Sequence, residues 1–327
     1  MARLKRQQSK GMMDDRESRL RAAWMYYDRR MTQKEIAEAL GLARTTIIRL
    51  LDEALRRGEV QIWIDSDSLT AIELGAALER HLGLDEAIIV PEARDQSEAS
   101  RSVGAALGRF LSETLTDNMS VGVGWGRTLT ASLAHFRPSR LSGAQVISLL
   151  GGMIESGPEN TTDYAWQLAS RMGAACYLYP APLLVDSAET ARILRERCGL
   201  DRLEKMAATL DMAVLGVGDI GADSLSLSRR AINPHEYAML QREGAICDIM
   251  CHALDRDGKE IDHALSQRIM SVPLPTLAAT RHLVLASGGV ARAPAIYAAI
   301  KGLGCHTLVT DESAARALLT CPAIRQA

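Results

Sequence analysis

The stretch from Met31 to Arg57 limits the possible folds more than any other, because it has the spacing of a helix-turn-helix. Apolar side chains recur at helical intervals on either side of Gly41, at Ile36, Ala37 and Leu40 and again at Ile47, Leu50 and Leu51. Gly41 supplies the positive φ that a tight turn between two helices needs. Thr32 and Glu35 have the spacing of a capping box at the start of the first helix. We therefore expect two short helices that cross closely at the small Ala37.

The second helix of this motif would present side chains suited to DNA on its outer side. Arg donates to guanine edges or phosphates, and Thr contacts a base or a thymine methyl group. The expected DNA contacts are Thr32, Gln33, Arg44, Thr45, Thr46 and Arg49. The simpler alternative is a helical hairpin with a polar outer face, but turn, cap, small crossing residue and basic surface together favour DNA binding. Ala43 stands where a Ser would cap the second helix better, a loss of about 1 kcal/mol.

Charge is divided unevenly along the 327 residues, of which 47% are hydrophobic, enough for a large core and two unequal domains. Residues 1–60 hold fourteen Lys or Arg against nine Asp or Glu, a net charge of +5, and the remainder has a net charge of −7. A basic head on an acidic body suits attraction to double-stranded DNA. No apolar run approaches the roughly 18 residues that span a bilayer, and no secretory signal is evident, so we expect a cytoplasmic protein without a membrane partner.

Composition divides the chain into a flexible polar arm at residues 1–15, a DNA-binding domain at residues 16–65 and a larger domain at residues 66–327. In the DNA-binding domain, Ser18 to Asp28 is expected to form a helix that braces the motif. Its inward residues would be Leu20, Ala23, Trp24 and Tyr27. Alternation from Val60 to Ile64 predicts a half-buried strand after the second helix of the motif.

From residue 69 onward, short apolar runs that end in turns alternate with amphipathic helical patterns. Strands are expected at Ala87–Val90, Ser120–Val123, Val146–Leu150, Met212–Val217 and His282–Ala286, and helices at Thr70–His81 and Glu98–Leu115. This alternation is typical of an α/β fold with a mostly parallel, doubly wound sheet. Asp257 and Gly258 predict a turn between Ile249–Leu254 and Glu260–Ile261, where one hairpin interrupts the parallel order.

The turn after Ser120–Val123 is the strongest candidate for a small-molecule site. Its glycines bring the backbone close to a ligand, and a helix is expected to begin near Arg127. Backbone N–H groups at that helix start, with two side-chain donors beside them, would hold a phosphate or several hydroxyl groups. The expected ligand contacts here are Gly124, Trp125, Gly126, Arg127 and Thr128. The alternative is a turn that only packs a helix against the sheet.

Two further segments have the chemistry of a ligand site. Gly288, Gly289 and Arg292 follow the strand at His282–Ala286, and open α/β sheets bind ligands at the carboxyl ends of their strands. Arg292 suits a phosphate or a carboxylate, although a solvated surface arginine is the alternative. Asp248 lies among apolar neighbours, where a carboxylate needs a ligand, an Arg or backbone donors, so we expect it to bind a hydroxyl group.

The six cysteines lie on scattered segments and lack a paired metal-ligand spacing, so we expect no metal and no other cofactor. We interpret them all as buried thiols: Cys176, Cys198, Cys247, Cys251, Cys305 and Cys321. Cys247, Cys251 and His252 form the one cluster worth testing as a metal site.

Motifs along nearly the whole chain resemble the SorC family of sugar-sensing transcriptional regulators. They are Glu59–Ile64, Gly122–Leu129, Ser148–Gly152, Tyr179–Pro182, Gly244–Asp248, Ser287–Arg292 and Leu308–Glu312 with Ala315. The resemblance implies a winged helix-turn-helix head, an effector domain folded like sugar-phosphate isomerases and deaminases, and a homodimer or homotetramer. It also implies effector contacts at Gly124 to Thr128, Asp248 and Arg292.

Three residues depart from the family pattern, since Arg292 replaces a usual Lys, Cys247 a Gly and Ala43 a Ser. Details at Trp24–Tyr27, Arg197–Leu200 and Asp262–His263 resemble the branch that controls catabolism of erythritol and related polyols.

The expected function is a DNA-binding regulator of a carbohydrate or polyol catabolic operon, whose DNA affinity changes with a small sugar, polyol or phosphosugar. Repression and activation both remain open. The alternative is an isomerase or deaminase that acts on a sugar phosphate, because fold does not settle activity. Such an enzyme needs a base, and the candidates Asp219, Asp311 and His252 lie in no recognisable catalytic motif. We therefore expect a protein that is not an enzyme.

Overall fold

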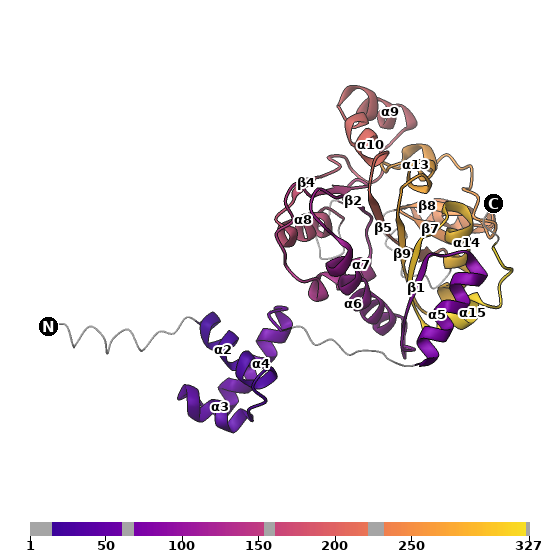
Figure 1. Cartoon of the computed structure of the whole chain (residues 1–327). Coiled ribbons are helices and arrows are strands. Elements are labelled where there is room, and N and C mark those ends of the chain that lie inside the picture. Colours follow the sequence, from indigo (N-terminus) through magenta and orange to yellow (C-terminus); the bar gives the residue numbers. More distant parts are fainter. Residues whose placement is uncertain (1–14, 61–68, 154–160, 222–231, 325–327) are drawn as a thin grey trace. The chain divides into compact units, whose positions relative to one another are not determined.

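The computed structural model describes residues 15–60, 69–153, 161–221 and 232–324. The chain forms two compact units, Met1–Asp65 and Ser66–Ala327, which we call the head and the body (Figure 1). Residues 1–14 of the expected arm and most of the strand expected at Val60–Ile64 lie outside the described residues. None of the described helices combines the length and the apolar composition that crossing a bilayer requires.

The described part of the head consists of three helices, α2 (Asp15–Tyr27), α3 (Gln33–Leu40) and α4 (Arg44–Arg56). The expected capping box begins α3, where the Thr32 N–H donates to the Glu35 carboxylate at 2.8 Å and the Glu35 N–H donates to the Thr32 hydroxyl at 3.3 Å. Gly41 ends α3 with a φ of 66°. The head core consists of Ala22, Ala23, Ile36, Ala37, Ile47, Leu50, Leu51 and Ala54. The expected helix-turn-helix is therefore confirmed.

The inward face of α2 differs from the expectation. Trp24 is 51% exposed and Leu20 is also exposed, so their assignment to the core is wrong. The buried face consists of Ser18, Arg19, Ala22 and Ala23, of which only the alanines belong to the apolar core. Small side chains let α2 approach α4 closely, whereas the Trp24 ring lies outside and stacks under the Arg29 guanidinium, 4.7 Å from the ring centroid. Helical periodicity correctly predicted the helix, but it assigned large residues to the core where the small alanines are buried.

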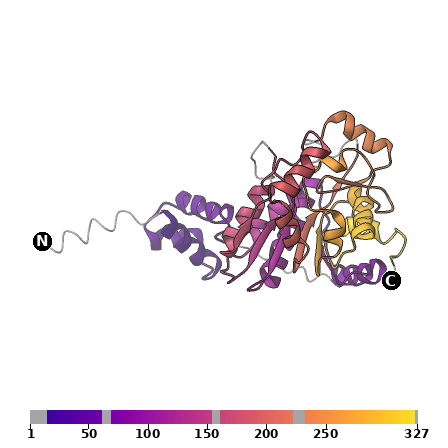
Figure 2. The ribbon, with the colours of Figure 1, turned by 90° about the horizontal axis from the view of Figure 1, so that it is seen from above.

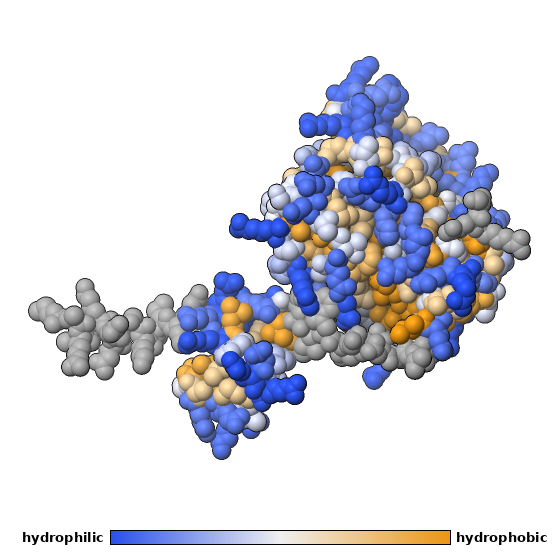
Figure 3. All heavy atoms as spheres, viewed as in Figure 1, coloured by the Kyte–Doolittle hydropathy of each residue, from blue (hydrophilic) through white to orange (hydrophobic). Residues whose placement is uncertain are grey.

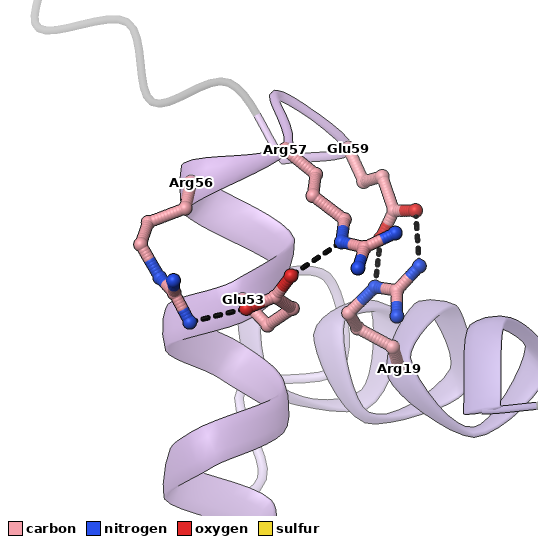
Figure 4. A network of polar contacts seen from close by, with 5 residues as sticks. All are labelled: Arg19, Glu53, Arg56, Arg57 and Glu59. Carbon is pink, nitrogen blue, oxygen red and sulfur yellow. Dashed lines mark hydrogen bonds and ion pairs between the residues drawn. The ribbon is translucent and has the colours of Figure 1, made fainter.

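An ion pair ties α2 to the chain beyond α4 (Figure 4). Arg19, which is 3% exposed, donates from Nε and Nη2 to the two carboxylate oxygens of Glu59 at 2.5 and 2.6 Å. These hydrogen bonds hold the pKa of Glu59 below its usual range. Since the folded-state pKa is lowered, the stabilisation is present above the unfolded-state pKa of Glu and is lost as the pH falls through the folded value. Glu53 accepts from both Arg56 and Arg57 beside this pair.

Substituting Arg19→Ala should loosen α2, because it leaves the Glu59 carboxylate without its bidentate partner and removes the buried arginine stem. We expect the free energy of local opening to fall by about 1–3 kcal/mol, measured by amide hydrogen exchange of the full chain in peptides from α2. Arg21→Ala is the matched control, since Arg21 is 58% exposed and lies 3.9 Å from Glu17. Equal protection in both variants would contradict a structural role for the Arg19–Glu59 pair.

The body is built on a parallel sheet of seven strands in the order β1-β10-β9-β5-β2-β3-β4. The strands are β1 (Glu86–Val90), β2 (Ser120–Val123), β3 (Gln145–Ser148), β4 (Ala175–Tyr177), β5 (Met212–Gly216), β9 (Leu283–Ala286) and β10 (Thr307–Asp311). The five expected strands are all confirmed within two residues at each end. The parallel α/β architecture follows from the expected alternation.

Helices cover both faces of this sheet (Figures 1 and 2). One face carries α6 (Gln96–Thr114), α7 (Arg127–Ser132), η1 (Leu133–His135) and α8 (Thr161–Met172). The other carries α5 (Leu69–Leu82), α9 (Ala188–Arg197), α10 (Asp201–Ala207), α12 (Pro234–Arg242), α13 (Leu274–Ala278), α14 (Ala293–Leu303) and α15 (Glu312–Leu318). Hydrophilic side chains dominate the visible surface over α9 and α10 (Figure 3). The helices predicted at Thr70–His81 and Glu98–Leu115 correspond to α5 and α6.

Successive strand residues belong to different cores. In β5, Val214 packs with α6 and α8, whereas its neighbours Ala213 and Leu215 pack with α14. Both faces of the central strands are therefore buried, which explains why they read as continuous apolar runs rather than as alternating patterns.

A small antiparallel sheet, β6 (Gly218–Asp219), β7 (Cys247–Ile249) and β8 (His252–Leu254), follows β5. The expectation of one strand from Ile249 to Leu254 is wrong, because Met250 and Cys251 form a tight turn with φ of 51° and 72°. The Asp248 carboxylate accepts the Cys251 N–H at 2.9 Å and stabilises this turn. A bridge between Leu254 and Glu260 does surround the turn that was expected at Asp257–Gly258.

Candidate functional site

The order of the strands creates a place for a ligand at the centre of the sheet. β2 and β5 are neighbours, but the chain continues from β2 to β3 on one side and from β5 toward β9 on the other. Loops that leave the carboxyl ends of such a pair diverge and open a crevice, where ligands bind in doubly wound folds. The loops after β2, β5 and β9 all reach this edge.

A pocket that opens to solvent lies at this crevice, with about 440 Å³ of empty space in which open solvent is included. Its lining residues are Trp125, Gly126, Arg127, Thr128, Gly216, Val217, Gly218, Asp248, Ala286 and Arg292. We call it the switch-point pocket. It brings together six of the nine expected effector contacts from three separate parts of the sequence, and it adds the end of β5, which was not expected to contribute.

The turn from β2 into α7 forms one wall. The Gly124 N–H donates to the Val214 carbonyl at 2.9 Å, so Gly124 extends the sheet and does not line the pocket. Gly126 has a φ of 128°, which L side chains rarely adopt. Gly216 lies beneath the turn, where a Cβ would come within 2.8 Å of the Trp125 carbonyl. These glycines therefore place Trp125 and Arg127 at the pocket, as expected for a turn that approaches a ligand closely.

Two guanidinium groups face the pocket. Nη2 of Arg127 is buried and has no hydrogen-bond partner among the described residues. Arg292 is only 7% exposed, and its Nε donates to the Asp219 carboxylate at 3.2 Å. Burial lowers the pKa of Arg292, and Arg127 adds to that shift, while Asp219 and Asp248 oppose it. Because an arginine pKa starts so high, the group remains charged at neutral pH. A surface arginine is therefore excluded at position 292.

Asp248 contributes a carboxylate to the lining of the pocket. Its side chain is buried, and one carboxylate oxygen accepts the Cys251 N–H. Asp248 pairs with Gly218 across the small sheet, which fixes its carboxylate beside the end of β5. The same carboxylate thus stabilises the Met250–Cys251 turn and contributes an acceptor to the pocket wall.

Gly288 and Gly289 do not line the pocket. The Gly289 N–H donates to the buried Asp311 carboxylate, and the Gly288 carbonyl accepts from the Gln96 side chain at 2.7 Å. A Cβ at Gly288 would lie 2.3 Å from an Asp311 oxygen. The two glycines therefore anchor the short helix η3 (Val290–Arg292), which delivers Arg292 to the pocket.

The three candidate bases are dispersed. Asp219 pairs with Arg292, Asp311 caps α15 through the N–H groups of Ser313 and Ala314, and His252 lies in a different pocket. None of the three lines the switch-point pocket.

The described residues contain no group of three or more His, Cys, Asp or Glu side chains arranged to hold a metal ion. Burial raises the pKa of the Cys247 and Cys251 thiols well above the ordinary value, which opposes formation of the thiolates that metals bind. Cys198 is exposed, and Cys176 and Cys321 are partly exposed, so the expectation of six buried thiols is wrong for these three.

In the head, the expected DNA contacts lie on the accessible side of the motif. Thr32, Arg44, Thr45 and Arg49 are exposed, and Gln33 and Thr46 are partly exposed. The starts of α3 and α4 meet there, because Arg44 Nε donates to the Gln33 side chain at 3.4 Å. Ala43 occupies the N-cap of α4 without a side-chain hydrogen bond, as the sequence indicated.

Substituting Ala43→Ser should stabilise α4, because a serine hydroxyl at the N-cap accepts a backbone N–H that Ala43 leaves uncapped. We expect about 0.5–2 kcal/mol more protection against amide exchange across α4 in the DNA-free chain. Ala43→Val, which supplies no acceptor, is the control. Strong exchange protection of α4 in the unmodified chain, unchanged by Ser, would contradict a capping deficit.

Comparison with known proteins places these features in one family. Residues 66–320 match the family described as "Putative sugar-binding domain". The transcriptional regulator LsrR of Klebsiella pneumoniae is 33% identical over 307 residues, which are 91% of this chain and 91% of that protein. The erythritol catabolism regulatory protein EryD of Brucella abortus is 27% identical and covers 93% of this chain, with 96% of its own length matched.

Among solved structures, the full-length sorbitol operon regulator SorC from Klebsiella pneumoniae has the same fold. It superposes with a TM-score of 0.71 at 24% identity, and the match covers 92% of this chain and 98% of that one. The similarity therefore extends over both the helical head and the α/β body.

Proposed function

The chain belongs to the SorC family of sugar-binding transcriptional regulators, and on that premise we propose that a small phosphosugar, sugar or polyol in the switch-point pocket controls its affinity for operator DNA. In this proposal α4 contacts the DNA, and the body binds the effector and assembles a homodimer or homotetramer. The regulated genes would serve carbohydrate or polyol catabolism, as the names of its relatives indicate for those proteins. The protein would act in the cytoplasm and would catalyse no reaction.

The observation that carries the proposal is the buried Nη2 of Arg127 at the switch-point pocket, which has no hydrogen-bond partner in the described part of the chain. A buried guanidinium donor without an acceptor costs free energy, which a ligand oxygen would recover. Arg292 already has Asp219 as its counter-ion, whereas Nη2 of Arg127 has no acceptor among the described residues and can donate to an anionic oxygen. Thr128 and Asp248 suit the hydroxyl groups of the same ligand. These donors and acceptors favour a phosphosugar over an unphosphorylated polyol in this pocket.

A bound effector would act by a population shift. The head of one protomer reads one half-site, so the spacing of two heads decides whether both half-sites are engaged. An effector that binds one arrangement of the oligomer better than another shifts the equilibrium by its differential affinity. No base is required at the pocket for this mechanism, and none of Asp219, Asp311 and His252 lines it.

Thermal unfolding of the full chain tests whether the pocket takes a phosphosugar. Erythritol 4-phosphate, sorbitol 6-phosphate and ribose 5-phosphate are compared with inorganic phosphate. A ligand at 100 times its Kd should stabilise the folded state by about 2.7 kcal/mol, and the unfolding temperature should rise accordingly. A rise with inorganic phosphate equal to that with every phosphosugar would show anion binding without sugar recognition and would contradict the proposal.

A further inference from the structure

The hairpin β7–β8 joins the switch-point pocket to a second polar pocket. Asp248 on β7 lines the first, and His252 at the start of β8 lines the second, four residues later. Between them lie Met250 and Cys251, whose positive φ values are unusual for residues other than glycine. The second pocket, which we call the His252 pocket, is open to solvent and holds about 870 Å³ of empty space in which open solvent is included.

Both ring nitrogens of His252 have partners. Nδ1 lies 2.6 Å from a Glu260 carboxylate oxygen, and Nε2 lies 2.6 Å from the Ser271 hydroxyl. The order Ser, His, Glu is that of a hydrolytic triad. Ser271, however, is only 1% exposed. The backbone N–H groups that follow its bridge partner Leu150 are those of Gly151 and Gly152. Both already donate hydrogen bonds, to the carbonyls of Met270 and Ala181. Those amides provide no oxyanion hole, so the arrangement suits binding rather than nucleophilic attack.

The lining of the His252 pocket differs in charge from that of the switch-point pocket. Three carboxylates, Glu204, Glu260 and Asp262, face one guanidinium, that of Arg195. Arg195 already forms an ion pair with Glu204 at 3.2 Å and donates to the Ile269 carbonyl at 2.7 Å. An excess of negative charge disfavours phosphates. Carboxylate oxygens accept hydroxyl hydrogens, and an amide such as that of Gln267 both donates and accepts.

We propose that the His252 pocket is a second ligand site, which binds an unphosphorylated sugar or polyol. The hairpin couples it to the switch-point pocket, because the Asp248 carboxylate that faces one ligand also accepts the Cys251 N–H next to His252. A ligand hydroxyl that competes for this carboxylate changes the free energy of the Met250–Cys251 turn and therefore the position of His252. By linkage, each ligand alters the affinity of the other by the same factor.

Ligand-observed NMR of the full chain with sorbitol, erythritol and ribose tests this site, since it detects weak binding. We expect at least one of the three to bind with a Kd at or below about 1 mM, a typical affinity for a small polar ligand. The double variant Asp262→Ala and Gln267→Ala changes two exposed side chains and should weaken that binding at least about tenfold. Arg127→Gln, in the other pocket, should leave it unchanged.

The outcomes separate this site from the proposed effector site. Binding of the unphosphorylated probe that survives Arg127→Gln but is lost in the double variant supports the second site, even if no phosphosugar binds. Loss in Arg127→Gln with retention in the double variant would place all ligands in the switch-point pocket and overturn the proposal. Absence of binding by all three probes at about ten times that Kd would also overturn it. An affinity independent of a phosphosugar bound at the first pocket would overturn the coupling through the hairpin.

Discussion

Substituting Arg127→Gln is expected to weaken the response to a phosphosugar while leaving DNA binding intact. Nη2 of Arg127 is a buried donor that has no partner among the residues that the structure describes, and glutamine removes the charge while retaining a polar side chain. A hydrogen bond to a charged group contributes about 1.5–3 kcal/mol, so the effector concentration for half response should rise about 10–100-fold. The measurement is release or recruitment of an operator duplex as a function of effector concentration.

Arg140→Gln is the matched control for this prediction, because Arg140 is exposed and lies away from the switch-point pocket, beside Ser139 and Arg171. It changes the net charge by the same amount and should respond like the unmodified chain. If Arg127→Gln also retains the response, Arg127 is not an effector contact. If it loses DNA affinity in the absence of effector, its effect is on the assembly rather than on the ligand.

The second large effect is expected in the head. Arg44→Ala and Arg49→Ala each remove an exposed guanidinium from α4, on the side where α3 and α4 begin together. Loss of a base or phosphate contact costs about 1–3 kcal/mol per protomer, so operator affinity should fall at least about tenfold for each substitution. A phosphate contact is distinguished from a base contact by its salt dependence, because the slope of log K against log salt should change by about 1.

Arg56→Ala is the control in the same helix. Arg56 lies in the last turn of α4 and pairs with Glu53, so its loss changes the charge of the head without touching the expected DNA face. Operator affinity should change little. If Arg44→Ala and Arg49→Ala bind as tightly as Arg56→Ala, the DNA-contacting surface lies elsewhere on the head.

Much of the fold could be predicted from local patterns in the sequence. The capping box at Thr32 and Glu35, the positive φ of Gly41 and the apolar spacing around them specify the α3–α4 motif. Continuous apolar runs indicate the central strands β2 and β5, because both faces of these strands are buried. The switch between these strands is not visible in the sequence, because strand order depends on pairings between distant segments.

Two of the sequence-based predictions of structure were wrong for a physical reason. Periodicity assigned the bulky Trp24 to the core, but the close contact of α2 with α4 selects Ala22 and Ala23. The Met250–Cys251 turn contains no glycine or asparagine, the residues that usually indicate a positive φ in a sequence. The Asp248 carboxylate stabilises the positive φ of these two residues instead. Both features depend on tertiary contacts, which override local preference.

For the candidate site, position in the chain was more informative than residue type. Arg127, Thr128 and Arg292 come together because each follows a strand that ends at the same edge of the sheet. Gly288 and Gly289 lie at the same edge, but the Gly288 carbonyl accepts from Gln96 and the Gly289 N–H donates to Asp311. These contacts between distant segments cannot be predicted from the sequence. The contribution of Gly216 to Gly218 was missed, although the end of β5 beside β2 carries the same signal as the other strand ends.

The most direct test of the central claim is the affinity of the full chain for an operator duplex with and without a phosphosugar. The duplex is obtained by enrichment from random DNA, and the Kd is measured by fluorescence anisotropy in the presence of a phosphosugar that raises the unfolding temperature. We predict that the Kd changes about 5–150-fold, the range of a coupling free energy of 1–3 kcal/mol, and that the same change in Arg127→Gln needs about 10–100 times more phosphosugar. An unchanged Kd with the phosphosugar bound would contradict control of the head by the switch-point pocket.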